Sequence, residues 1–240
     1  MPNEAKKYEI VKSNSIIHGG KTLCRIRALR DFNTTYGEKV YEGFLGGYIE
    51  TENNLSQEGT CWIFDNAKVY GDAQVYGDAE VYGEVWVFGK AEVYGNAIIH
   101  GDAKVYDNAQ IYENAEVYEE ARVYGNAKIL GKAEIGDCSQ IYDNAIVNDY
   151  VWTYGNVKIY GNAKICEKAQ IHDNAEVKGD ACICGNTFVC GTAKISSNKK
   201  IKTGRYIVKS LNVDEALNEI KPICDKIDFV SKAINSNFPV

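Results

Sequence analysis

The chain has 240 residues, of which 45% are hydrophobic and 25% are charged, with a formal net charge of −6 and a pI of about 5.2. This acidic balance argues against general binding to nucleic acid or to a membrane surface. No N-terminal apolar stretch resembles a signal peptide, and no run approaches membrane-spanning length. The eight cysteines lack the spacing of a disulfide framework. We therefore expect a cytoplasmic protein in a reducing compartment.

Residues 1–61 contain strand-like runs, such as Leu-Cys-Arg-Ile-Arg-Ala-Leu at 23–29, but no repeat. The segment that follows is strongly repetitive, and an uncovered end of a repetitive sheet would be a template for aggregation. We therefore predict that residues 1–61 form an N-terminal cap.

Residues 62–202 repeat the six-residue unit Ala-x-Val-Tyr-Gly-Asn/Asp, as at 73–78 and 91–96. Every sixth residue from Ile63 to Ile201 is Val or Ile, except Thr153. Self-similarity at a fixed short period is typical of a solenoid. On an extended segment Ala and Val share the inward face, the x residue and Tyr point outward, and Gly-Asn or Gly-Asp forms a corner. Three walls and corners close one coil, which predicts an all-β solenoid of about eight triangular coils, about 38 Å long.

This repeat resembles the hexapeptide-repeat proteins, and the resemblance implies a left-handed parallel β-helix that forms homotrimers. It differs from the usual motif of that family by placing Tyr directly after the aliphatic residue. The repeat, together with the lead-in residues 45–50 and 54–59, is also similar to uncharacterised proteins of phages and Gram-positive prophages. That second resemblance implies a location in the host cytoplasm if the chain is phage-encoded.

Residues 203–240 are predicted to form a strand at 205–208 and then an amphipathic helix. The apolar positions of this helix alternate in spacings of three and four: Val213, Ala216, Ile220, Ile223, Ile227, Val230 and Ile234. Such a seam with Ile at both positions favours a trimeric coiled coil. The alternative is a helix that covers the last coil of its own solenoid, and Pro222 should kink or split the helix in either case.

Residues eighteen apart stack in columns, so one outer wall should carry an aromatic ladder flanked by basic residues. We take Tyr106, Tyr124, Tyr142, Lys104, Arg122 and Lys158 from this wall as candidate ligand-binding residues. Aromatic rings beside cations suit a planar, anionic, nucleotide-like ligand or an acidic protein surface. The alternative is that the tyrosines only stabilise the sheet or are buried between subunits.

A second wall brings Cys166, Cys182 and Cys184 together. Three thiols could hold zinc, although a structural zinc site normally has a fourth ligand. The sequence offers no histidine in this column, and small residues at a subunit interface would explain the cluster equally well.

The third wall carries Ile98, Trp152 and Phe188 at outward positions, which predicts a contact surface. It also carries His100 and His172, the candidate general bases if the hexapeptide resemblance extends to an acyltransferase that uses acyl-CoA. They lie four coils, or roughly 19 Å, apart, so they cannot share one metal ion. Glu116 and Glu134 could orient His100. However, no loop interrupts the repeat to build an acyl-CoA site.

From these observations we expect a non-enzymatic, homotrimeric binding solenoid of phage or prophage type that needs no cofactor. It would either capture a small anionic, nucleotide-like molecule between subunits, as a sponge for a host nucleotide signal, or present a rigid surface to a protein partner such as a host protein. The alternatives are a structural scaffold without a small ligand and the acyltransferase.

Overall fold

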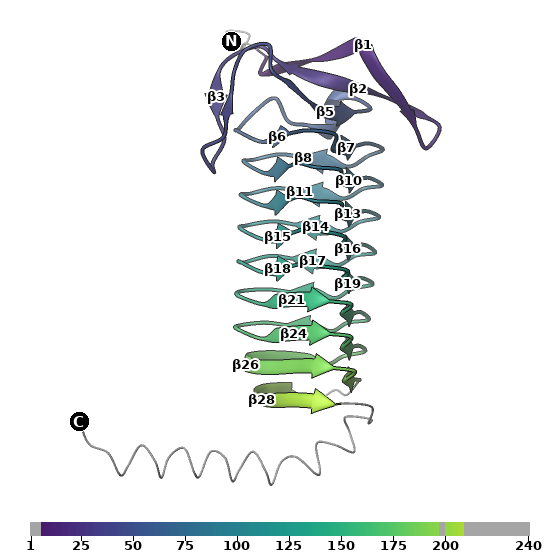
Figure 1. The fold of residues 1–240 in the computed structure, drawn as a ribbon, viewed down its shortest axis with the longest axis vertical. Coiled ribbons are helices and arrows are strands. Elements are labelled where there is room, and N and C mark those ends of the chain that lie inside the picture. The colour runs from purple at the N-terminus through teal and green to yellow at the C-terminus, as the bar shows by residue number, and fades with distance from the viewer. Residues whose placement is uncertain (1–5, 197–199, 209–240) are drawn as a thin grey trace, which may run out of the picture.

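The computed structural model describes residues 6–196 and 200–208, and within this part of the chain the fold is a parallel β-solenoid of about nine turns (Figure 1). Helix is confined, among these residues, to the short 3-10 segment η1 (Glu52–Asn54). No helix of the described residues is long and apolar enough to cross a membrane. The all-β solenoid predicted from the repeat is confirmed.

Three columns of parallel strands form the walls of the solenoid, which we name A, B and C. Wall A consists of β5 (Leu45–Ile49), β7 (Lys68–Val69), β10 (Trp86–Val87), β13 (Lys104–Val105), β16 (Arg122–Val123), β19 (Gln140–Ile141), β22 (Lys158–Ile159), β25 (Glu176–Val177) and β27 (Lys194–Ile195). Wall B consists of β8 (Gln74–Val75), β11 (Glu92–Val93), β14 (Gln110–Ile111), β17 (Lys128–Ile129), β20 (Ile146–Val147) and β23 (Lys164–Ile165). Wall C consists of β6 (Trp62–Ile63), β9 (Glu80–Val81), β12 (Ile98–Ile99), β15 (Glu116–Val117), β18 (Glu134–Ile135), β21 (Trp152–Gly155) and β24 (Gln170–Asp173). β26 (Cys182–Gly191) runs from wall B into wall C, and β28 (Lys200–Val208) pairs along it.

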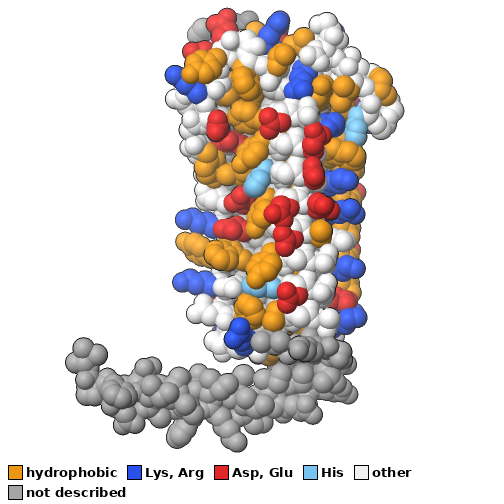
Figure 2. Space-filling model, in the orientation of Figure 1, with side chains coloured by type: hydrophobic (Ala, Val, Ile, Leu, Met, Phe, Trp, Pro, Cys, Tyr) orange, Lys and Arg blue, Asp and Glu red, His pale blue; other side chains and the backbone are white. Residues whose placement is uncertain are grey.

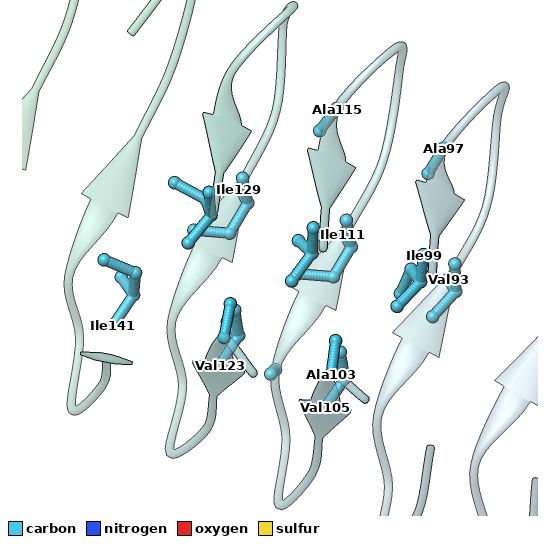
Figure 3. Packing of buried hydrophobic residues seen from close by; sticks show 14 of the residues in the cluster. Val93, Ala97, Ile99, Ala103, Val105, Ile111, Ala115, Val123, Ile129 and Ile141 are labelled. Atoms are coloured by element: carbon cyan, nitrogen blue, oxygen red, sulfur yellow. The ribbon is translucent and has the colours of Figure 1, made fainter. Parts of the chain in front are cut away.

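Each strand pairs in parallel with the strand one coil further on, so that equivalent positions of the repeat stack. Val93, for example, pairs with Ile111, and the outward Glu92 pairs with Gln110. The inward Val, Ile and Ala side chains of the repeat are fully buried and meet along the axis (Figure 3). Because apolar side chains fill the interior, chemistry and binding must take place on the outer walls.

The corners explain why Gly, Asp and Glu alternate at one position of the repeat. Gly125 has φ of +69°, and a Cβ there would lie 2.8 Å from the backbone nitrogen of Asp143. At several corners an acidic residue takes this left-handed conformation and its carboxylate accepts a hydrogen bond from the next coil. At one of them, Gly125 N donates to Asp107 Oδ2 over 3.1 Å. The adjoining corner position forms asparagine ladders, in which Asn108 Nδ2 donates to Asn126 Oδ1 at 3.0 Å. Side-chain hydrogen bonds therefore compensate for the strained backbone of these corners.

The N-terminal residues extend wall A with antiparallel strands. β1 (Tyr8–His18) pairs with β2 (Lys21–Ala28), and β2 pairs with β5, which begins the parallel column. β3 (Phe32–Asn33) and β4 (Lys39–Val40) form a separate hairpin. Lys7 is fully buried and its ammonium group donates to the Cys61 carbonyl at 2.9 Å, while burial lowers the pKa of Lys7. This segment lies over the N-terminal coil, where the sequence predicts a cap.

The solenoid begins before residue 62, because Ile49 and Leu55 pair with Val69 and Val75 as inward residues of an earlier coil. Two extra residues between Leu55 and Ile63 hide this coil from a search for a strict six-residue period. At the other end, the strand predicted at 205–208 is part of β28. The amphipathic helix predicted after residue 208, with its trimer seam, lies outside the described residues.

Candidate functional site

The aromatic ladder of wall A consists of rings that stack on one another. The centroid of the Tyr124 ring lies 4.8 Å from that of Tyr106 and 4.9 Å from that of Tyr142, with planes within 4° of parallel. Burial raises the pKa of all three phenols, that of Tyr142 to about 12. Because neighbouring rings cover both faces, a planar ligand could reach only the edges and hydroxyls of these tyrosines.

The ends of the ladder are also covered. His18 from β1 lies edge-on to Tyr70, with ring centroids 5.4 Å apart. At the other end, the Tyr160 hydroxyl donates to Glu176, and the Lys178 ammonium lies 5.9 Å from the Tyr160 ring centroid. Such ring stacking is what we expect if the tyrosines stabilise the sheet, which is the alternative to ligand binding given in the sequence analysis.

Beside the ladder, Lys104 and Arg122 line a shallow depression of about 330 Å³. The Lys104 ammonium lies 4.3 Å from the centroid of a ring of Trp86, which also lines the depression. The depression also contains Lys68, and three carboxylates border it: Glu84, Asp102 and Glu120. Three cations thus face three anions, and the Lys68 ammonium is already paired with Glu84 at 3.2 Å. Lys158 lies two coils beyond Arg122 and does not line this depression.

A neighbouring corner is strongly acidic and was not anticipated from the sequence. Asp102, Glu119, Glu120 and Asp137 line a hollow of about 500 Å³ between walls C and A. A hydrogen bond with Asp137 raises the pKa of Glu119. These residues occupy corner positions, which the repeat assigns to turn formation, so their clustering became apparent only from the stacking of coils.

His100 lies on wall C between two tyrosines. Its ring stacks with Tyr82 and Tyr118, with centroids 5.2 Å and 5.4 Å away, and its Nε2 lies 2.7 Å from Glu116 Oε1. Burial raises the pKa of Glu134, which stacks on Glu116 in the next coil. Glu116 therefore holds His100, as the sequence suggests, but Tyr82 and Tyr118 cover both faces of the imidazole.

His172 occupies a different environment, four coils from His100. It is 4% exposed, packs against Tyr154 and Phe188, and burial lowers its pKa. Its Nε2 has no hydrogen-bond partner among the described residues. The two histidines are not brought together, in agreement with the distance estimated from the sequence.

The three cysteines of wall B do cluster. A disulfide joins Cys166 and Cys184 across one coil, and Cys182 Sγ lies 3.6 Å from Cys184 Sγ. The expectation of thiols in a reducing compartment did not anticipate this disulfide. The two cysteines are eighteen residues apart, which is the length of one coil, so they stack in adjacent coils. This separation indicates a disulfide only once the period of the solenoid is known. Cys184, expected to point outward, is 1% exposed.

An aromatic row crosses wall C and the corner before it, and consists of Tyr150, Trp152 and Tyr154. These side chains are 54%, 49% and 45% exposed, respectively. The Lys132 ammonium lies 5.5 Å from the Tyr150 ring centroid. Ile98 and Phe188, predicted on the same contact surface, are only partly exposed. Figure 2 shows hydrophobic side chains between basic ones at one edge of this face and acidic side chains along its middle.

Comparison with models of known protein families gives a match within the repeat. A family model described as a YdcK β-solenoid repeat matches residues 139–155, which include β19, β20 and β21 and the aromatic row. A search of curated proteins finds no match. The fold and this match together identify a β-solenoid repeat protein.

Proposed function

We propose that the chain is a non-enzymatic binding solenoid that self-associates through the aromatic row of wall C. The observation that carries this proposal is the exposure of Trp152 and Tyr154 on strand β21 and of Tyr150 at the corner just before it. Soluble monomers rarely leave a contiguous apolar patch open to water, and burial of aromatic rings drives protein association. A second copy of the chain is the occupant, and the hexapeptide resemblance implies a trimer.

The surroundings of the row fit the anatomy of a protein interface, in which a charged rim surrounds an apolar centre. Lys132 lies against Tyr150, and Glu134 pairs in register with Trp152 from the adjacent coil. Side chains on a solenoid wall are held by the backbone ladder of both neighbouring coils. Little ordering entropy is therefore lost when such a surface is buried.

The test compares the mass in solution of the wild-type chain with that of Trp152→Glu. We expect the substitution to shift an oligomer to monomer, because it places a charge at the centre of a desolvated contact. Lys128→Glu, at the equivalent outward position of wall B, is the matched control and should leave the oligomer intact. An unchanged mass for Trp152→Glu would remove the row from the interface, and a monomeric wild type would contradict self-association.

A second candidate function is capture of a small anionic molecule at the depression of wall A. The contact between Lys104 and Trp86, with Arg122 beside it, supports this candidate. The bordering carboxylates weaken it for highly charged anions, and the covered ring faces of the ladder weaken stacking of a base. ADP is a suitable probe in calorimetric titration. A heat of binding that is lost in Arg122→Glu and kept in Lys128→Glu would support capture. The absence of a heat of binding with the wild type would contradict it.

A further inference from the structure

Four side chains near the C-terminal end of wall B offer donor atoms that zinc prefers. Cys166 Sγ, Cys184 Sγ and a Glu167 carboxylate oxygen lie within 4.8 Å of one another. Cys182 Sγ lies 3.6 Å from Cys184 Sγ, on the same strand. Zinc is bound in proteins by thiolates and carboxylates in four-coordinate sites. The sequence alone supplied three thiols without a fourth ligand, and the structure adds Glu167 at the adjoining corner.

These cysteines are concentrated where the repeat changes. The earlier coils of wall B carry Tyr76, Tyr94 and Tyr112 in the column that ends in Cys166 and Cys184. The column that contains Cys182 has no thiol in its earlier coils, which carry Gln74, Glu92, Gln110, Lys128, Ile146 and Lys164. Thiols enter these two columns of wall B in adjacent coils near its C-terminal end, which places the three cysteines next to one another.

The local charges suit a bound dication. Three thiolates and one carboxylate with a divalent ion carry a formal charge of −2. Cys182 stands in register between Lys164 and Lys200, whose two positive charges balance this excess. Glu167 is exposed and Cys166 and Cys182 are partly exposed, so an ion can enter from solvent.

We propose a zinc site formed by Cys166, Cys182, Cys184 and Glu167. The Cys166–Cys184 disulfide blocks this site, and its reduction allows the ion to bind. In the disulfide state two of the four donors are bonded to each other. A dithiol reductant donates two electrons and two protons to the S–S bond, which yields two thiols and the oxidised reductant. Binding of Zn²⁺ then displaces one proton from each of the three thiols, and the carboxylate completes the site.

The test uses the full chain, reduced with a phosphine, and titrated with Co²⁺ as a spectroscopic probe and then with Zn²⁺. We expect one metal ion per chain in native mass spectra, thiolate-to-cobalt charge-transfer absorption that Zn²⁺ removes, and no uptake by the disulfide form. Cys182→Ser and Glu167→Gln should each weaken binding by at least about tenfold. Cys138→Ser removes an exposed thiol at a different corner and should bind as the wild type does.

Protection from alkylation provides a measurement that needs no variant. Zinc should slow the reaction of iodoacetamide with Cys166, Cys182 and Cys184 in the reduced chain, and leave the rate at Cys138 unchanged. The proposal is overturned if reduced wild type takes up no metal, if Cys182→Ser binds as tightly as the wild type, or if zinc protects Cys138 equally. Small residues at a subunit interface would explain the cluster in that case.

Discussion

Among the residues at every sixth position from Ile63 to Ile201, only Thr153 is neither Val nor Ile, and its side chain shows what the core tolerates. It is 1% exposed, and its hydroxyl has no hydrogen-bond partner among the described residues. Ser139, which stands at an Ala position of the repeat, has the same defect. A buried hydroxyl without a partner loses its hydration with no compensation.

Thr153→Val should therefore raise the free energy of unfolding by about 1–2 kcal/mol, because it removes the orphan hydroxyl and keeps the shape. The midpoint of thermal unfolding measures this. Thr187→Val is the matched control: Thr187 is equally buried, but its hydroxyl donates to the Cys184 carbonyl, so its removal should be neutral or destabilising. A lower midpoint for Thr153→Val would contradict this account of the core.

Residue-level patterns predicted which side chains point inward, because successive side chains on an extended strand point to opposite faces. The period of eighteen residues predicted which outward residues stack in columns, but not how their side chains would contact one another. The stacking of His100 between Tyr82 and Tyr118 required the coil period together with side-chain rotamers. The disulfide between Cys166 and Cys184 required the same register.

At the scale of the wall, the tyrosine ladder couples folding to pH. Burial raises the pKa of Tyr142 in the ladder, and of Tyr76 on wall B, to about 12 from 10.0, and it raises the pKa of Tyr106 and Tyr124 in the ladder. A raised folded pKa means that the contribution is complete below the unfolded value of 10.0 and is lost as the pH rises toward 12. Urea unfolding at about pH 9 and about pH 11 should show a marked fall in the midpoint at the higher pH.

The tyrosine absorbance gives an independent control for this prediction. Phenolate absorption of the folded chain should develop at a higher pH than that of the chain in urea. Coincident titration curves in the two states would contradict the burial of the ladder. Tyr124→Ala, which removes two ring contacts from its centre, should lower the free energy of unfolding by about 1–3 kcal/mol.

At the end of the same wall, Glu176 should make the chain sensitive to acid. Its pKa is lowered to about 2 from 4.5 by the hydrogen bond from Tyr160 and by Lys178 and Lys194. A lowered carboxyl pKa stabilises the fold above 4.5, and this contribution is lost as the pH falls toward 2.

We expect Glu176→Gln to lower the free energy of unfolding at neutral pH by about 1 kcal/mol, since the carboxylate is partly exposed and screened by solvent. The difference between variant and wild type should shrink as the pH falls below 4.5. Unfolding midpoints measured across this range check the prediction, and a difference that stays constant with pH would argue against the ion-pair network.

Element boundaries of the walls followed from the repeat, whereas the cap did not. The antiparallel addition of β1 and β2 to wall A depends on tertiary pairing, which no local period encodes. The extra coil before residue 62 was missed because two inserted residues interrupt the period. The sequence therefore predicts the structure best where each coil repeats its neighbour, and least well at the N-terminal end, where the solenoid is covered by the cap.

On the scale of the whole molecule, the closed interior leaves only the outer walls for function. Wall A carries a ladder whose rings cover one another and a depression with balanced charges. Wall B carries the cysteine cluster. Wall C carries the most exposed aromatic row of the repeat region, and it is this row that leads us to self-association.

The most direct test of that central claim is the mass of the full chain in solution, recorded by native mass spectrometry at micromolar concentration. The account predicts a homo-oligomer, with the trimer implied by the hexapeptide resemblance as the expected stoichiometry. A chain that stays monomeric at every concentration would contradict it, because Tyr150, Trp152 and Tyr154 would then face water permanently.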